Sequence, residues 1–467
     1  PSGAEPWQSL PSVSDLLDEP RVQELTGRQS RAEVLEAIDL ALAGFRCALR
    51  PGDSAPDTEQ VLRGVTDALE RRLLERLRPV INATGIILHT GLGRAVLPRR
   101  AAEGLALMDR PCNMQMDLET GLRGKRSHRT EALLTRLTGA EAALVVNNNA
   151  AATLLVLSAL CRGKEVLVSR GQLIEIGGSF RLLNCVHQSG AILVEVGSTN
   201  KTHLADYESA FTENTGAILR VNPSNYKMIG FTKQVTTAEL VRLKKKRDVL
   251  VIDDLGCGVL VDLEKVGLPH EPMVQESLAA GADVACFSGD KLIGGPQAGI
   301  IVGRAELIGR LKKHPLTRML RIGKLTDMAL ERTLELFLRP ETLLEDHPTL
   351  RMAATPARAV RQRASRLKRR LGAVGGPVEV RVVSTESAMG GGALPGVPIP
   401  SWALAVRSSS LSADRLAAQL RLNSPPIIGR IREDEVILDL RTVLPGEEMQ
   451  VLEALRRIAG TPSGPTA

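Results

Sequence analysis

A series of short apolar runs, separated by stretches with helical periodicity, occupies the middle of the chain and most constrains its fold. The runs are apolar at successive positions, which is typical of strands that helices cover on both faces. Strands and helices that alternate in this way predict an α/β domain with a doubly wound, mostly parallel sheet. The predicted strands are Ala142–Val146, Glu165–Val168, Ala191–Val196, Ala217–Val221, Val249–Ile252, Val284–Phe287 and Gly299–Val302.

The region before this centre has a different pattern. Apolar residues recur at three- and four-residue steps in Arg31–Leu49 and again in Thr58–Leu77, which predicts two amphipathic helices. Asp57 followed by Gln60 is a capping pattern at the start of the second helix. A small helical N-terminal domain is the expected result.

The length of 467 residues also requires more than one domain, because single cores stop growing near roughly 250 to 300 residues. After the α/β centre, we predict a Gly/Pro-rich loop at Gly390–Pro400 and a strand at Glu435–Leu440. The predicted parts are a helical N-terminal domain over 1–79, the α/β domain over 80–339, a C-terminal α+β subdomain over 340–460 and a disordered tail over 461–467.

The charge distribution favours an anionic partner without identifying one. The net charge is +7, although residues 1–78 carry more acidic than basic side chains, so the basic excess lies downstream. The densest basic stretch is Arg351–Arg370, which contains no acidic residue. It is either a solvated helix face or a helix that faces a polyanion, and the sequence leaves both readings open.

Several classes of protein are disfavoured by what the sequence lacks. No apolar run reaches the roughly 18 to 20 residues needed to cross a bilayer, and the first twenty residues have no signal pattern, so we expect a cytoplasmic protein with no membrane contact. The six cysteines include no C-x-x-C pair, which argues against a zinc site and a disulfide framework. We expect reduced, mostly buried cysteines and no metal.

A lysine in the central sheet is the first candidate for chemistry. Lys291 follows the predicted strand Val284–Phe287, and Gly294 and Gly295 come soon after it. The C-terminal end of a strand is where an open α/β sheet binds its ligands. A lysine in such a string is weak support by itself, because most are surface turns.

Two upstream motifs strengthen this candidate, because their order is the one that a type I enzyme dependent on pyridoxal 5'-phosphate (PLP) needs. Asn147–Ala152 joins a strand to a helix, and its small residues would let backbone N–H groups face a phosphate. Asp253 and Asp254 then end a strand, and either carboxylate could pair with the protonated pyridine nitrogen of the cofactor. Taken singly, these motifs could also be an ordinary helix cap and a pair of solvated loop acids.

With these motifs in place, the sequence resembles the bacterial selenocysteine synthases, the L-seryl-tRNA(Sec) selenium transferases, over nearly its whole length. Several matching segments run for ten or more residues, which makes chance a poor explanation. They are Leu10–Val13, Arg78–Leu97 (RPVINATGIILHTGLGRAVL), Asp117–Gly121, Thr138–Ala152, Ser169–Arg181, Ser224–Tyr226, Gly230–Lys233 and Ser288–Gly303.

The resemblance implies a type I PLP-transferase fold and assigns roles to individual residues. Lys291 would be the Schiff-base lysine and Asp254, rather than Asp253, the partner of the pyridine nitrogen. Asp290 is a second candidate for proton transfer, although a structural role is more common for a carboxylate beside the lysine. The other implied cofactor contacts are Asn148, Asn149, Ala150 and Ser288, and the implied selenophosphate clamp is Arg94, Arg318 and Arg321.

The implied reaction is β-elimination of water from seryl-tRNA(Sec) to a dehydroalanyl-tRNA, followed by addition of selenium from selenophosphate. The implied assembly is a homo-oligomer, with a dimer as the minimum and a decamer as in the family's bacterial members. The sequence departs from the family at Cys257, where serine is usual, and at Asn222-Pro223, where His-Thr is more common. The segment Gln172–Ser179 holds no aromatic residue that could stack on the cofactor ring.

Two other functions remain alternatives at this point. One is a PLP-dependent lyase or aldolase that acts on a small amino acid or sugar acid, because related folds catalyse many reactions. The helical N-terminal domain disfavours it, since a small substrate needs no such addition. The other is an inactive tRNA-binding relative, which the presence of Lys291, Asp254 and the arginine set disfavours.

Overall fold

The structure, a computed structural model, describes residues 10–50, 54, 56–124, 126–178, 180–245, 247–372 and 378–460. The described residues form two compact units: one runs up to Val80 and includes Ser424–Pro426, and the other contains the rest. The predicted tail at 461–467 lies outside the described residues. The predicted domain boundaries at residues 79 and 339 stay predictions.

The first unit is helical, and short polar side chains fix where its helices begin. Ser12, Ser30 and Asp57 each accept a hydrogen bond from the backbone three residues later, in complete capping boxes. The two predicted helices are confirmed, and both contribute to one apolar core. The helices of this unit are α1 (Val13–Asp18), α2 (Pro20–Arg28), α3 (Arg31–Ala48) and α4 (Thr58–Glu75).

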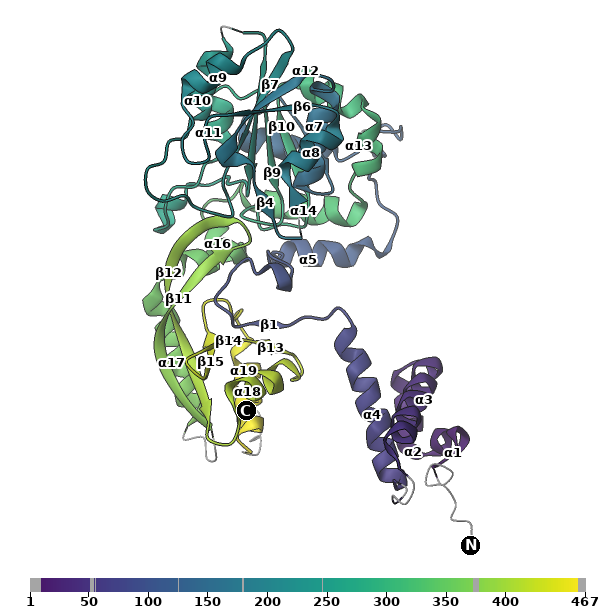
Figure 1. Ribbon diagram of the computed structural model, residues 1–467. Coiled ribbons are helices and arrows are strands. Elements are labelled where there is room, and N and C mark those ends of the chain that lie inside the picture. The colour runs from purple at the N-terminus through teal and green to yellow at the C-terminus, as the bar shows by residue number, and fades with distance from the viewer. Residues whose placement is uncertain are drawn as a thin grey trace. The chain divides into compact units, whose positions relative to one another are not determined.

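Seven of the described strands form the central sheet of the second unit, in the order β2-β10-β9-β8-β7-β3-β6 (Figure 1). Each predicted apolar run is one of these strands. The pairs from β9 to β6 are parallel, whereas β10 is antiparallel to both β2 and β9. The strands are β2 (Ala142–Val146), β3 (Glu165–Ser169), β6 (Ile192–Val196), β7 (Thr215–Val221), β8 (Leu250–Gly256), β9 (Val284–Ser288) and β10 (Gly299–Gly303).

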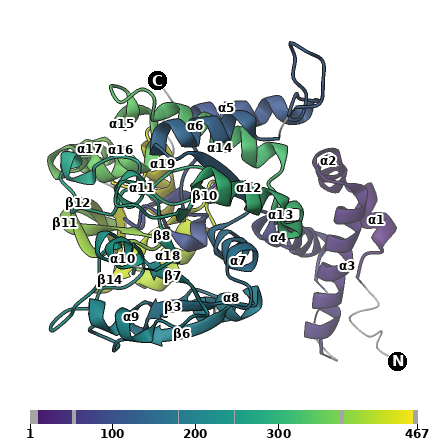
Figure 2. The ribbon, with the colours of Figure 1, turned by 90° about the horizontal axis from the view of Figure 1, so that it is seen from above.

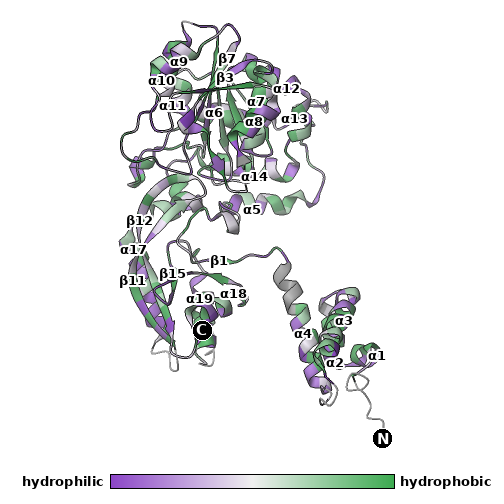
Figure 3. Cartoon of the chain, in the orientation of Figure 1, coloured by the Kyte–Doolittle hydropathy of each residue, from purple (hydrophilic) through white to green (hydrophobic). Residues whose placement is uncertain are grey.

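Helices cover both faces of this sheet, as the turned view in Figure 2 shows. One face packs against α7 (Asn149–Leu160), α8 (Leu182–Ser189) and α12 (Ala305–Lys313). The hydropathy colouring of Figure 3 shows the apolar strands between these layers. The opposite face packs against α6 (His128–Thr138), α9 (Leu204–Ala210), α10 (Thr237–Lys244), α11 (Val274–Ala279) and α14 (Lys324–Leu336).

A second sheet, of four described strands in the order β11-β12-β15-β14, lies in the C-terminal part of this unit. The prediction of a loop at Gly390–Pro400 is wrong, because only the turn between β11 and β12 is irregular there. The predicted strand at Glu435–Leu440 is confirmed as β15. The strands are β11 (Val378–Gly390), β12 (Ala393–Ser408), β14 (Arg430–Arg432) and β15 (Glu435–Asp439).

Three helices pack on this second sheet, and two short strands contribute to the same core. The apolar core beneath the second sheet draws side chains from α17, α18 and α19. The short strand β1 (Ile81–Asn82) pairs in parallel with β13 (Ile427–Ile428). The remaining helices are α5 (Arg99–Ala106), α13 (Pro315–Leu320), α15 (Leu343–Asp346), α16 (Pro348–Ala354), α17 (Ala357–Leu371), α18 (Ala413–Arg421) and α19 (Glu448–Ile458).

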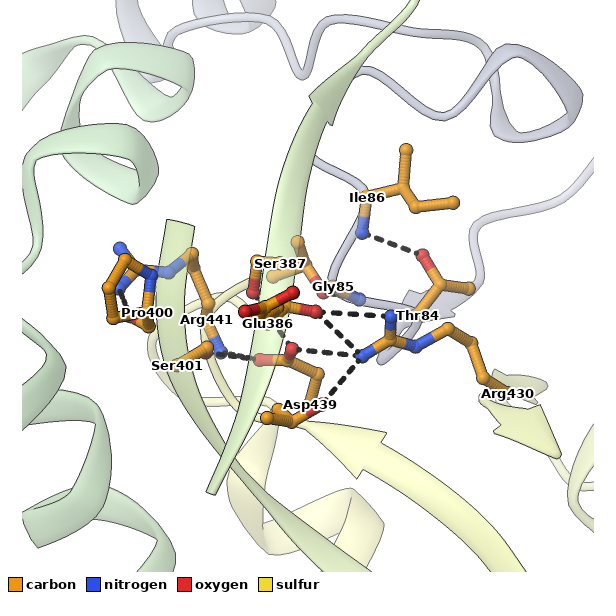
Figure 4. Close-up of polar contacts among 12 residues, drawn as sticks. Thr84, Gly85, Ile86, Glu386, Ser387, Pro400, Ser401, Arg430, Asp439 and Arg441 are labelled. Carbon is orange, nitrogen blue, oxygen red and sulfur yellow. Dashed lines mark hydrogen bonds and ion pairs between the residues drawn. The ribbon is translucent and has the colours of Figure 1, made fainter. Parts of the chain in front are cut away.

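A buried carboxylate holds together the strands of the second sheet (Figure 4). Asp439 is fully buried, and its two oxygens accept hydrogen bonds from the hydroxyls of Ser387 and Ser401 at 2.8 and 2.7 Å. The same carboxylate accepts the backbone N–H of Arg441 at 3.0 Å and faces the Arg430 guanidinium at 3.4 Å. Burying a charge without partners costs free energy, and these four contacts offset that cost for Asp439.

The described residues include no helix that is both long and apolar enough to cross a bilayer. They also contain no cluster of His, Cys, Asp or Glu side chains suited to hold a metal ion. The six cysteines are free, and four of them are buried. Burial raises the pKa of the Cys161 and Cys185 thiols to about 12, so both are neutral at ordinary pH.

The Asp439 contacts lead to the first prediction, a matched pair of Asp→Asn substitutions. In Asp439→Asn, the amide oxygen can accept from only some of the four donors, and the NH₂ group faces the others. We expect the free energy of unfolding to fall by roughly 3 kcal/mol. The control is Asp434→Asn, at an exposed turn position with a positive φ of 59° that asparagine tolerates. Urea unfolding should show a lower midpoint for Asp439→Asn alone. Equal midpoints would show that the network contributes nothing.

Candidate active site

A cavity of about 290 Å³ lies where the strands of the central sheet end and α7 begins. It brings together residues that are almost 200 positions apart in the sequence, as the meeting of strand ends in a parallel sheet requires. Eight of the ten predicted site residues line it: Arg94, Asn148, Asn149, Ala150, Asp254, Ser288, Asp290 and Lys291. The other two, Arg318 and Arg321, do not.

Lys291 is held by a loop that closes on itself after β9. The N–H of Gly289 donates to the carbonyl of Ala298 at 2.8 Å, and the N–H of Gly294 donates to the carbonyl of Lys291 at 3.0 Å. The side chain of Lys291 is only 7% exposed, yet its Nζ has no hydrogen-bond or ion-pair partner among the described residues. The amine of Lys291 is therefore nearly buried, lies at the cavity and has its N–H donors free.

A histidine that the sequence analysis missed supports this loop. His347 is fully buried at the start of α16, where its Nε2 lies 2.9 Å from the carbonyl of Ile293 and its Nδ1 accepts the N–H of Leu350. These two contacts fix the neutral form with the proton on Nε2. Burial lowers the pKa of His347 to about 4, so the ring keeps this role at neutral pH. A side chain at Gly294 would collide with the ring, which explains glycine there.

Of the two aspartates on β8, Asp254 faces the cavity. Its carboxylate accepts hydrogen bonds from Asn149 Nδ2 at 2.7 Å, Thr153 Oγ1 at 2.9 Å and the N–H of Gly256 at 3.1 Å. Burial raises the pKa of Asp254, while these hydrogen bonds and the positive charge of Lys291 oppose the rise. The carboxylate is thus a desolvated acceptor placed between the helix α7 and the lysine.

Asp253 points to the other side of the sheet and has a full set of structural partners. It forms an ion pair with Arg220 at 2.7 Å and accepts hydrogen bonds from the hydroxyls of Thr237 at 2.9 Å and Ser277 at 2.7 Å. Adjacent residues of a strand face opposite sides, so only one of the two carboxylates can reach the cavity.

The N-terminus of α7 forms another wall. Asn148 caps the helix by accepting the N–H of Ala151, which leaves the N–H groups of Asn149 and Ala150 without a protein acceptor among the described residues. The Oδ1 atom of Asn149 is buried and has no partner in that part of the chain either. A helix N-terminus with free N–H groups is suited to an anion such as a phosphate.

The predicted arginines occupy different surroundings. Arg94 lines the cavity and donates from Nη1 to Asp290 Oδ2 at 2.7 Å, so Asp290 is engaged in an ion pair. Arg318 and Arg321 are exposed at the end of α13 and have no ion pair within the described ranges. Arg321 forms an isolated bridge with Val146, which places its backbone beside the end of β2.

The turn between β11 and β12 reaches the lysine, which the sequence analysis did not anticipate. Gly390, Gly391 and Gly392 all have positive φ angles, between 59° and 79°. A Cβ atom on Gly392 would lie 3.2 Å from Lys291 Nζ, and one on Gly391 would lie 2.8 Å from Leu88. The three glycines therefore allow the backbone to approach the amine closely.

The remaining walls are partly apolar. The segment Gln172–Ser179 holds no aromatic residue that could stack on a cofactor ring. It contributes Ile174, Ile176 and Gly177 to the cavity lining. Ser224, which is buried, also lines it, and its Oγ would lie 3.6 Å from a Cβ on Gly392. A flat ligand would thus meet aliphatic side chains in this segment.

Comparison with known proteins supports the fold and identifies the family. Among proteins of known structure, D-glucosaminate-6-phosphate ammonia-lyase matches with a TM-score of 0.57 over 84% of this chain and 98% of its own, at 22% identity. That identity supports the fold alone. Together, the fold, the strand-end lysine and the buried aspartate define the class of type I PLP-dependent enzymes.

The sequence relatives identify the family within this class. A family model described as L-seryl-tRNA selenium transferase (SelA) matches residues 80–444. The L-seryl-tRNA(Sec) selenium transferase of Moorella thermoacetica is 46% identical over 96% of both chains. That of Carboxydothermus hydrogenoformans is 46% identical over 94% of this chain and 95% of its own. The chain belongs to the L-seryl-tRNA(Sec) selenium transferase family.

The close approach at Gly392 gives the second prediction. Gly392→Ala places a methyl group 3.2 Å from Lys291 Nζ and should slow covalent uptake of PLP, followed by absorbance, roughly 10- to 100-fold. Gly396→Ala is the matched control, because it has a similar positive φ of 69° but open space around it. If both variants lost uptake equally, backbone strain rather than contact with the lysine would be the cause.

Proposed function

We propose that this protein converts seryl-tRNA(Sec) to selenocysteyl-tRNA(Sec), with PLP held at Lys291 and selenophosphate as the selenium donor. The observation that carries the proposal is the meeting of Lys291, Asp254 and the N-terminus of α7 in one cavity. The 46% identity to selenium transferases over nearly the whole chain favours this reaction over a lyase or aldolase acting on a small substrate. The retained lysine and aspartate disfavour an inactive tRNA-binding relative.

The residues present fit PLP. The free N–H groups of Asn149 and Ala150 suit its phosphate, together with the nearby hydroxyl of Ser288. The buried carboxylate of Asp254 suits a protonated ring nitrogen, since a desolvated anion gains most from a cationic partner. The unpartnered Oδ1 of Asn149 offers a further acceptor on the same wall. The free amine of Lys291 is placed to hold the aldehyde.

Bound PLP supplies an electron sink that stabilises negative charge at the α-carbon of the seryl group. The chain's own part is to move protons and exclude water. Lys291 Nζ takes the proton from the α-carbon, and the nearly buried position of this amine limits access of bulk water. Burial raises the pKa of Asp254, and the hydrogen bonds that Asn149, Thr153 and Gly256 donate to it favour its charged form against that rise. Asp290 positions Arg94 through their ion pair.

Selenophosphate would bind to Arg94, Arg318 and Arg321. A guanidinium group donates two parallel hydrogen bonds, which suits a tetrahedral oxyanion better than an ammonium group does. The ion pair with Asp290 occupies one N–H of Arg94 and leaves others for the anion. Arg318 and Arg321 are exposed and unpaired in the described part of the chain, so they keep their full donor capacity.

A homo-oligomer, with a dimer as the minimum, belongs to the proposal. Met116, Leu118 and Leu122 are each more than half exposed on one loop, and exposed apolar clusters of this kind mark contact surfaces. The decamer follows from the family resemblance alone, as does a cytoplasmic location. We also propose a tRNA contact by the helical N-terminal domain, residues 1–79. Its Arg63 and Arg76 are each paired with a glutamate, and the side chains of Arg71 and Arg72 lie outside those described.

The third prediction tests Lys291 as the cofactor lysine. Purified protein should be yellow, with a visible absorption band that borohydride removes, and Lys291→Ala should lose both this band and the conversion of seryl-tRNA(Sec). Lys324→Ala is a control at another lysine, whose Nζ donates to the carbonyls of Met108 and Arg110. A Lys291→Ala protein that kept a band sensitive to borohydride would contradict the assignment of Lys291 as the cofactor lysine.

The fourth prediction separates the two half-reactions. If Arg318 and Arg321 bind selenophosphate, replacing either with alanine should slow selenium transfer at least tenfold and leave tRNA affinity and its salt dependence unchanged. Lys313→Ala is the control, because Lys313 is an exposed cation at the end of the preceding helix α12. Dehydration of seryl-tRNA(Sec) and product formation should be followed separately. Equal loss of tRNA affinity and selenium transfer would instead assign these arginines to the nucleic acid.

A further inference from the structure

The helix α17 carries a charge pattern that the active site does not use. One face is apolar and anchored, because Val360, Ala364, Leu367 and Leu371 are buried in the core beneath the second sheet. The rest of the helix is strongly basic and contains no acidic residue. The basic stretch found in the sequence is therefore a helix fixed on a rigid support, with its charges directed outward.

These charges line an open groove of about 680 Å³ along the helix. Arg361 is held in place by stacking over the ring of Trp402, with 4.5 Å between the guanidinium carbon and the ring centroid. The groove residues are Arg358, Arg361, Gln362, Ser365, Arg366, Lys368, Arg369 and Val382.

Most of the groove cations have no counter-charge. Arg358, Arg366, Lys368 and Arg369 are exposed and make no ion pair or hydrogen bond within the described residues. Arg363 is different, because it turns away to pair with Glu448 of α19 at 2.6 Å. Like charges three or four positions apart destabilise a helix, so this arrangement costs folding free energy that a bound anion would offset.

We propose that the α17 groove binds the phosphate backbone of one helical arm of the tRNA substrate. From Arg358 to Arg369 the helix spans roughly 17 Å at 1.5 Å per residue, long enough to meet several successive phosphates. Gln362 and Ser365 add neutral donors of the kind that contact phosphate oxygens. A small anion would use one or two of these groups, whereas an open row of them suits a polyanion. This inference rests on the proposed function.

The test compares two double variants that remove the same charge. Arg366→Gln/Arg369→Gln neutralises the groove, and Arg162→Gln/Lys265→Gln neutralises two exposed cations elsewhere that have no partner in the described chain. The dissociation constant of an unacylated tRNA(Sec) transcript is measured over a salt series with the full-length proteins. The groove variant should bind more weakly and flatten the slope of log affinity against log salt by about one unit per lost contact. The control should keep the slope of the unmodified protein.

The melting temperature and the oligomer size of the groove variant are measured alongside its affinity. Removing like charges should preserve or raise the melting temperature, so weaker binding would not come from unfolding. Unchanged salt slopes in both variants would overturn the proposal. It would also be overturned if the groove variant changed oligomer size by sedimentation without a change in slope, because the groove would then be a contact between copies. Binding of unacylated tRNA does not depend on turnover, so this experiment tests the groove separately from the proposed function. The proposed function would be contradicted by a different result, namely that the unmodified protein does not convert seryl-tRNA(Sec).

Discussion

The backbone of Gly85 packs closely against the buried Asp439, and this close approach constrains the segment that leads to the active site. Its carboxylate is held by strands β11, β12 and β14 (Figure 4), and a side chain at Gly85 would approach it to 2.3 Å. The segment Gly85–Leu88 can therefore lie directly against the second sheet, where the N–H groups of Ile87 and Leu88 donate to the carbonyls of Ala388 and Met389. That segment continues to Arg94 in the cavity, while β11 continues to the turn at Gly392 above Lys291. The backbone contacts of this segment with β11 thus bring together two parts of the site that lie far apart in the second unit's sequence.

The electrostatics of the cavity follow from opposed effects at a few buried groups. Burial raises the pKa of Asp254, and three hydrogen bonds together with the charge of Lys291 act against that rise. The thiols beneath the same wall stay neutral, because burial raises the pKa of Cys185 to about 12 and that of Cys286 well above its ordinary value. Of the three groups, Asp254 is the one whose charged form is favoured by hydrogen bonds and a nearby cation, which suits it to face a bound cation. Asp253, one residue away, forms an ion pair with Arg220 on the other side of the sheet.

Much of this could be predicted from the sequence, because the relevant signals are local. Runs apolar on both faces identified the strands of the central sheet, and the order of phosphate loop, aspartate and lysine placed these groups together, since parallel strands end at one edge. The direction of β10 was not predictable, because apolarity does not encode direction. β12 was missed because Pro395, Gly396, Pro398 and Pro400 indicate a loop. Among the described residues, this part of β12 pairs with β11 on one side only, so proline is tolerated in the strand. His347 and Gly392 act through contacts between distant segments, which no local pattern reports.

Arg94 differs from the cations of α17 in a way that fits an anion of a different size. Arg94 is paired with Asp290, so the local net charge is small and its guanidinium is oriented, with N–H groups left to direct at one compact ligand. The α17 cations are unpaired in the described chain, exposed and spread along a helix, so their attraction is long-ranged and weakly directional. Directional donors select a small tetrahedral anion in competition with other anions. A row of unpaired charges instead gains free energy by releasing the counterions of a long polyanion. Under the two proposals, Arg94 belongs to the site for the small anion and α17 belongs to a separate site for the tRNA.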